Sequence, residues 1–269
     1  MTQWDREKVI ESLHALEIKF GRRPVKRDNA NLYFLSRKFF GSWNEMMKLA
    51  GYEVTPYQEA KLPDLKSDSL YYFLGLLSTD GHIVFNNKNG YKIMLFTSYK
   101  EEREMILRLV KNLFEYNASI REKLFGFSKR INYEIYISSK KLAVFLVDKL
   151  NMPPGAKSLT IEIPKAIVNG NKSQIASFIR AVIDGDGSII KTEKSSMLKV
   201  VSGSKKFIEE LQLLFEKLGI FSGKIAQERE NLWVLRFSTK EDIKKLYPII
   251  YKDAEYYYNR KEKIWRQYI

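Results

Sequence analysis

The chain has 269 residues, enough for one large domain or two modest ones, and its 45% hydrophobic and 29% charged content is that of an ordinary globular protein. Lysine and arginine outnumber aspartate and glutamate by 46 to 32, and the net charge of +14 favours a polyanionic partner, nucleic acid before an anionic membrane. The lack of cysteine excludes disulfides, thiolate zinc sites and cysteine nucleophiles, and the two histidines argue against multi-histidine metal sites.

The sequence has no apolar run of the length needed to span a bilayer, and the stretch from Met1 to Glu7 has no apolar signal-peptide region. We therefore expect an intracellular protein, either cytoplasmic or nucleoid-associated, with an organelle as the alternative.

Residues 1–54 are predicted to form a small helical domain. A helical stripe of apolar residues runs from Trp4 to Phe20, a second helix covers about Leu32 to Phe40, and a third covers Trp43 to Ala50. Residues 55–67 are polar and contain two prolines, so we expect a linker there.

The rest of the chain reads as two units of the same order. Residues 68–151 predict helix, two strands, helix, two strands and helix, with the first helix over Ser69 to Thr79 and the last over Lys140 to Leu150. A connector spans residues 152–170, and residues 171–269 repeat the order, with helices ending near Gly185, Leu218 and Ile250. The repeat predicts two similar halves around a pseudo-twofold axis.

Each half begins with the same short pattern. Phe73 to Gly81 and Ile179 to Gly187 are mostly apolar helical segments that end in Asp-Gly, and their aspartates, Asp80 and Asp186, are 106 residues apart. Small residues four apart, Gly75 with Thr79 and Ala181 with Gly185, form two smooth stripes along which the helices can pack closely. Two carboxylates brought together in this way repel each other unless cations lie between them.

Two other interpretations of these segments compete with this one. Asp-Gly at the end of a single helix commonly only ends the helix in a turn, because both residues favour turns. Here the whole pattern is repeated, which makes that interpretation less favoured. A calcium loop starting at Asp184 would require glutamate at its twelfth position, where the chain has Ser195, and is discarded. Arg180, within the second segment, is expected to bury its stem and keep its charged head at the rim.

The two segments resemble the two motifs of the LAGLIDADG homing endonuclease family, and the order around them resembles that family's tandem αββαββα fold of the α+β class. The resemblance covers about residues 68–269. Residues 1–54, with Gly21 to Pro24 and Phe40 to Trp43, resemble a helical repeat often fused to homing endonucleases. The resemblance implies a monomeric, site-specific endonuclease that acts on double-stranded DNA and has no membrane partner.

The resemblance also implies a catalytic site. Asp80 and Asp186 match the motif position that binds divalent ions, with backbone carbonyls near Thr79 and Gly185 completing the coordination. Oxygen ligands suit Mg²⁺ or Mn²⁺, and Ca²⁺ is expected to bind without supporting cleavage. A basic residue is expected beside each scissile phosphate, and the candidates are Lys100, Lys191 and Lys205.

DNA contacts are expected from basic residues of the helical domain, the strands and the C-terminal tail. The candidates are Arg22, Arg23, Lys26, Arg27, Arg37, Lys38, Lys88, Lys92, Arg121, Lys123, Lys129, Arg130, Lys140, Lys194, Lys199, Lys224, Arg229, Arg236, Lys240, Arg260 and Lys261. The tail aromatics, such as Tyr256 and Trp265, are expected to pack on the second half. The alternative function is a protein that binds without cutting, either a maturase acting on intron RNA or a DNA-binding regulator.

Overall fold

The computed structural model describes residues 4–54, 58–86, 90–125, 130–191 and 196–267. The chain divides into two compact units, Met1–Tyr57 and Gln58–Ile269. Within the described residues no helix is both long enough and apolar enough to cross a membrane.

The first unit consists of three short helices, close to the predicted positions: α1 (Arg6–Phe20), α2 (Ala30–Phe40) and α3 (Trp43–Leu49). Each begins at a capping side chain, namely Asp5, Asn29 or Ser42, which accepts a backbone N–H of the first turn. The helices bury a separate small core of Val9, Leu13, Leu32, Leu35, Trp43, Met46 and Met47.

The second unit contains two halves with the same order of elements. In the first half these are α4 (Asp68–Asp80), β1 (Gly81–Asn86), β2 (Gly90–Thr97), α5 (Lys100–Phe114), β3 (Ser119–Phe125), β4 (Arg130–Ile137) and α6 (Lys140–Val144), which continues as a π-helical turn (Phe145–Lys149). The four strands form an antiparallel sheet in the order β1-β2-β4-β3.

The second half repeats this arrangement after a short connecting helix, α7 (Lys165–Val168). Its elements are α8 (Lys172–Asp186), β5 (Gly187–Lys191), β6 (Ser196–Ser202), α9 (Lys205–Lys217), β7 (Lys224–Arg229), β8 (Leu232–Phe237), α10 (Lys240–Tyr251) and α11 (Asn259–Arg266). The strand order β5-β6-β8-β7 matches that of the first sheet. The predicted α+β fold with two like halves is confirmed, and α11 is an additional helix.

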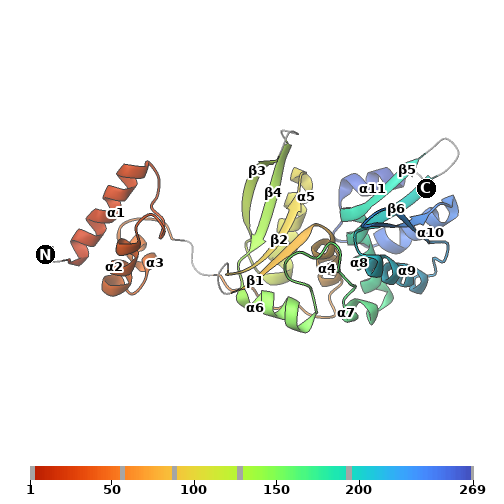
Figure 1. Cartoon of the computed structure of the whole chain (residues 1–269), viewed down its shortest axis with the longest axis horizontal. Coiled ribbons are helices and arrows are strands. Elements are labelled where there is room, and N and C mark those ends of the chain that lie inside the picture. The colour runs from red at the N-terminus through yellow and green to blue at the C-terminus, as the bar shows by residue number, and fades with distance from the viewer. Residues whose placement is uncertain (1–3, 55–57, 87–89, 126–129, 192–195, 268–269) are drawn as a thin grey trace. The chain divides into compact units, whose positions relative to one another are not determined.

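The two motif helices, α4 and α8, pack against each other between the two sheets (Figure 1). The approach is close enough that a Cβ on Gly75 would lie 2.5 Å from Ala181 Cβ and 2.7 Å from Phe178 O. A Cβ on Gly185 would overlap Thr79 on the facing helix. The two small-residue stripes therefore meet as the sequence predicts.

Two expectations about local structure are wrong. The linker predicted at 55–67 extends too far, because Ala60 is completely buried and Lys61 N donates to Phe114 O. Side chains add to this attachment, because Gln58 Nε2 donates to Glu115 O and Lys61 Nζ donates to the Glu115 carboxylate, each at 2.7 Å. The charged head of Arg180 does not lie at the rim, because the side chain is buried and its guanidinium donates to Tyr256 O and Ile250 O.

Candidate active site

The two motif aspartates lie together where α4 and α8 end. Both are half-buried, and Asp80 Oδ2 lies 2.9 Å from the position of a Cβ on Gly185, one residue before Asp186. Burial and then the charge of Asp80 raise the pKa of Asp186 to about 7. Burial and then Glu102 raise the pKa of Asp80. A bound cation would relieve this repulsion, so the pair fits a hard divalent ion.

Two lysines approach the aspartates, one from the connector between the halves and one from the C-terminal helix α11. Lys157 Nζ donates to Gly81 O at 2.6 Å and lies 3.4 Å from Thr79 O, while Lys261 Nζ donates to Gly187 O. Burial lowers the pKa of both ammonium groups, and for Lys261 the nearby Arg260 lowers it further. Gly81 and Gly187 each follow a motif aspartate, so the two lysines occupy equivalent positions.

A buried polar network holds the C-terminal segment against the motif helices. Asp184 is 1% exposed, and its Oδ2 accepts from Tyr72 OH at 2.7 Å and from Tyr258 N at 2.9 Å. Burial raises the pKa of Asp184 to about 7. The Arg180 hydrogen bonds to Tyr256 O and Ile250 O fix the same segment. These contacts position Lys261 three residues after Tyr258.

Whether Lys100, Lys191 and Lys205 lie beside the scissile phosphates stays a prediction. Lys100 and Lys205 are the exposed first residues of α5 and α9, and Lys205 Nζ lies 3.2 Å from Glu209 and over the ring of Trp233. Lys191 ends β5, and its side chain falls outside the described residues. Among the described residues, Lys157 and Lys261 are lysines whose charges act on both motif aspartates.

Lys157 is absent from the sequence-based candidates, and Lys261 is predicted there only as a DNA contact. The signal that could have identified them is their separation of 104 residues, which is close to the repeat of the aspartates. No local pattern other than the lysine itself is shared between the two positions.

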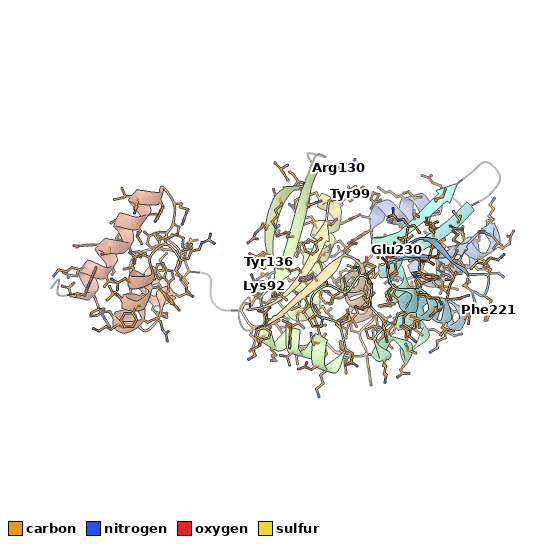
Figure 2. The ribbon with its side chains drawn as sticks, in the orientation of Figure 1. Lys92, Tyr99, Arg130, Tyr136, Phe221 and Glu230 are labelled. Carbon is orange, nitrogen blue, oxygen red and sulfur yellow. The ribbon has the colours of Figure 1, made fainter. Side chains whose placement is uncertain are left out.

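Basic side chains cover the face of the first sheet opposite its core. Arg121 pairs across the strands with Glu134, which is next to the buried Ile135 and so points to the other side. By the same alternation Lys92, Lys123 and Arg130 share that face. Lys92 Nζ lies 5.9 Å from the centre of the Tyr136 ring, and Figure 2 shows the two together.

The second sheet has an equivalent row. Lys199 pairs with Arg236 across one strand pair, and Lys224 pairs with Arg236 across the next. The three basic side chains therefore form a row across one face of the sheet. Each sheet also has one glutamate within its basic surface. Glu134 accepts from Lys123 at 2.5 Å and lies 3.7 Å from Arg121, and Glu228 bonds Lys199 and Arg236.

Further DNA-contact candidates lie on other exposed surfaces of the two units. Arg22, Arg23, Lys26, Arg27, Arg37, Lys38, Lys140, Arg229 and Lys240 are exposed, whereas Lys88, Lys129 and Lys194 lie outside the described residues. Both ends of the Arg22 guanidinium bind Asp28 at 2.8 Å, so this side chain also stabilises the turn before α2. The DNA-contact role of this set stays a prediction.

The two aspartate carboxylates suit an ion of the magnesium type that is also bound by a substrate. They are too few to enclose an ion by themselves. Across the described ranges no three histidine, cysteine, aspartate or glutamate side chains form a metal-binding cluster. Mg²⁺ commonly uses one or two carboxylates together with water and substrate phosphates. Asp80 and Asp186 would supply the two carboxylates, and the basic surface beside them would bind the phosphates.

The duplicated fold, the paired motif helices and the acidic centre together define a two-motif α+β scaffold. Residues 67–150 and 173–251 match the family of the LAGLIDADG-like domain. The chain belongs to this family, as the resemblance predicted.

The chain is also similar to proteins of several different kinds. The chain is 25% identical over 183 residues to homing endonuclease I-ApeI of Aeropyrum pernix, a match that covers 66% of this chain and 78% of that protein. It is 25% identical over 200 residues to a probable translation initiation factor IF-2 of Methanocaldococcus jannaschii, of which it spans only 15%. It is 24% identical to a probable cell division protein WhiA of Clostridium botulinum over 69% of this chain and 59% of that protein.

Solved structures share the fold. The homing endonuclease I-WcaI bound to its DNA recognition sequence has a TM-score of 0.56 at 14% identity, covering 80% of this chain and 95% of that one. Mesophilic variants of the homing endonuclease I-DmoI give 0.52 at 20% identity, with 70% and 97% coverage.

Proposed function

We propose that this chain is a site-specific endonuclease that cuts both strands of double-stranded DNA and requires a divalent ion, Mg²⁺ foremost. The observation that carries the proposal is the carboxylate pair Asp80 and Asp186, held together by two close-packed motif helices. Asp80 and Asp186 would hold the ion, which supplies Lewis-acid activation for phosphodiester hydrolysis when bound. DNA rather than RNA is proposed because the related I-WcaI was solved on a DNA recognition sequence.

The protein's own residues have separate tasks in this proposal. The basic rows on the two sheets bind the duplex. A two-stranded ribbon fits the major groove, and lysine and arginine side chains neutralise the DNA phosphates. Lys157 and Lys261 place a positive charge on either side of the acidic centre, where negative charge develops on the phosphate. Each half then acts on one strand.

The direct test uses the DNA that flanks the gene. Rejoining the flanks without the gene, or without its intron, gives a candidate target, which is incubated with the purified chain in Mg²⁺ and separately in EDTA. The proposal expects double-strand cutting at one position in Mg²⁺ and none in EDTA. Equal cutting in both would contradict metal dependence.

A second candidate function is DNA binding without cleavage on the same scaffold. The match to a probable cell division protein favours it, because that relative is not named as a nuclease. Tight, specific binding in Mg²⁺ without any strand cut would support this alternative.

Replacing Lys157 or Lys261 by methionine is expected to slow cleavage about a hundredfold, the usual effect of removing one group that stabilises transition-state charge. The affinity for DNA should change little, because both ammonium groups bond to backbone carbonyls at the acidic centre. Single-turnover cleavage rates and equilibrium binding are compared. The control is Lys165→Met, an exposed lysine at the start of α7. A cleavage rate as unaffected as that of the control would exclude a catalytic role.

The first unit is expected to bind phosphates of the duplex. Removing residues 1–57 should weaken DNA binding and reduce the slope of log affinity against log salt by about 0.9 for each phosphate that this unit neutralises. The second unit has its own core and should still fold and cut at higher protein concentration. Footprinting and salt titration test this. An unchanged footprint and salt slope would show that the basic residues of the first unit do not contact DNA.

A further inference from the structure

The two halves correspond residue by residue around the acidic centre, which allows their two catalytic sites to be compared. Gly81 pairs with Leu95 in the first sheet, and Gly187 pairs with Val200 in the second. The offset from Leu95 to Val200 also relates Lys100 to Lys205, the first residues of α5 and α9.

The correspondence reveals a charge pair present on one side only. Extending this offset matches Glu102 with Phe207, both buried two residues into α5 and α9. Lys157 and Lys261 are equivalent, so the residues directly before them, Ala156 and Arg260, are equivalent too. The Asp80 side therefore has a carboxylate and a guanidinium where the Asp186 side has a phenyl ring and a methyl group.

Arg260 is held in place by groups of the other half. Its Nη2 donates to Glu102 Oε1 at 3.1 Å, and its guanidinium carbon lies 4.1 Å from the centre of the Tyr99 ring. Glu102 is 6% exposed and is fixed from the other side by Thr97, whose Oγ1 donates to Oε2 at 2.5 Å. Tyr99, labelled in Figure 2, directly precedes α5.

The side chain of Arg260 is 38% exposed, so its guanidinium is accessible to a ligand despite the bond to Glu102. Among the described residues the Nε of Arg260 is buried and has no hydrogen-bond partner. Arg260, Asp80, Glu102 and Tyr99 line the same cavity of about 360 Å³. A partly exposed planar guanidinium with an unused N–H, beside a carboxylate that would hold the metal, is suited to a phosphodiester oxygen.

We propose that Arg260 binds the scissile phosphate of one DNA strand only, and that this strand is cut before the other. The inference rests on the proposed endonuclease function. In the hydrolysis a water oxygen bonds to phosphorus as the bond to one sugar oxygen breaks, and the sugar oxygen takes up a proton that the water loses. Arg260 contributes no atom to this exchange. It stabilises the charge on phosphate oxygens, and Glu102 and Tyr99 position it.

The experiment follows both strands at once. A duplex containing the target has a different dye on the 5′ end of each strand, and cleavage in Mg²⁺ is sampled over time by denaturing gel. The wild-type chain is expected to cut one strand first. Arg260→Ala should slow that strand about a hundredfold, the usual cost of one transition-state donor, and leave the other within about twofold, so that nicked DNA accumulates. Arg266→Ala is the matched control, because Arg266 is on the same helix, is exposed and binds Glu262.

Two further variants keep the inference decidable if Arg260→Ala does not fold. Glu102→Gln preserves shape but weakens the hold on Arg260, and Arg260→Lys keeps the charge but loses the planar fork. Both should slow the same strand by smaller factors. Slowing of both strands alike, or an unchanged strand order in variants that fold and cut, would overturn the inference and leave the endonuclease function standing. A wild-type chain that binds the duplex and cuts neither strand would refute the proposed function, and this inference with it.

Discussion

Asp186→Asn is expected to reduce double-strand cleavage by about a thousandfold while DNA affinity stays within a few-fold of the wild type. The substitution keeps the shape of the side chain but removes one of the two charges that would hold the divalent ion. A metal contributes several kcal/mol of transition-state stabilisation, and at about 1.4 kcal/mol per tenfold this corresponds to about three orders of magnitude. Binding is dominated by phosphate contacts of the basic surfaces, which the substitution does not touch.

The raised pKa of Asp186 gives this prediction a second observable. Burial and the charge of Asp80 both disfavour the charged form of this carboxylate, so above its pKa of about 7 the asparagine variant should unfold at a slightly higher temperature without metal. Asp148→Asn, an exposed aspartate in the π-helical turn, serves as the control and should cut at the normal rate. Cleavage by Asp186→Asn at the rate of this control would show that the catalytic centre lies elsewhere.

Gly75→Val is expected to lower the free energy of unfolding by about 3 kcal/mol or more, the upper range for overpacked cores. The added Cβ alone would lie 2.7 Å from Phe178 O, a backbone atom that cannot move without displacing α8. Gly75→Ala makes the test sharper, because close packing and helix propensity predict opposite signs for its change in the free energy of unfolding. Without a clash, alanine in a helix is about 1 kcal/mol more favourable than glycine.

Urea unfolding measures both variants. The close packing predicts that Gly75→Ala destabilises the chain and that valine destabilises it more, with DNA cleavage falling in the same order because the aspartates are carried by the packed helices. If alanine stabilises the chain, the two helices are not as close at Gly75 as the structure shows.

Much of the fold follows from local pattern. The motif segments, their small residues at i and i+4 and the strand alternation predict helices and sheets that the structure confirms, because each pattern is set by its own element. The placement of Asp80 beside Asp186 also follows, since both end helices that pack through matching stripes. Their catalytic role remains the subject of the tests above.

The features that the sequence did not predict depend on contacts between distant segments. Lys157 lies in a connector with no regular periodicity, and only the fold brings it to Gly81 O. Arg180 is buried because backbone carbonyls more than sixty residues away accept its guanidinium, at Ile250 and Tyr256. The pairing of Lys199 and Arg236 with Glu228 depends on strand register, which hydrophobic alternation alone does not fix.

The most direct test of the endonuclease assignment uses a double variant, Asp80→Asn with Asp186→Asn, to select bound fragments from a randomised DNA library in Mg²⁺. The recovered consensus is then offered to the wild-type chain under the same conditions. The account predicts one long recognition site, bound by both proteins and cut on both strands by the wild type alone. Recovery of a specific site that the wild type binds but leaves intact in Mg²⁺ would contradict it and establish a DNA-binding protein instead.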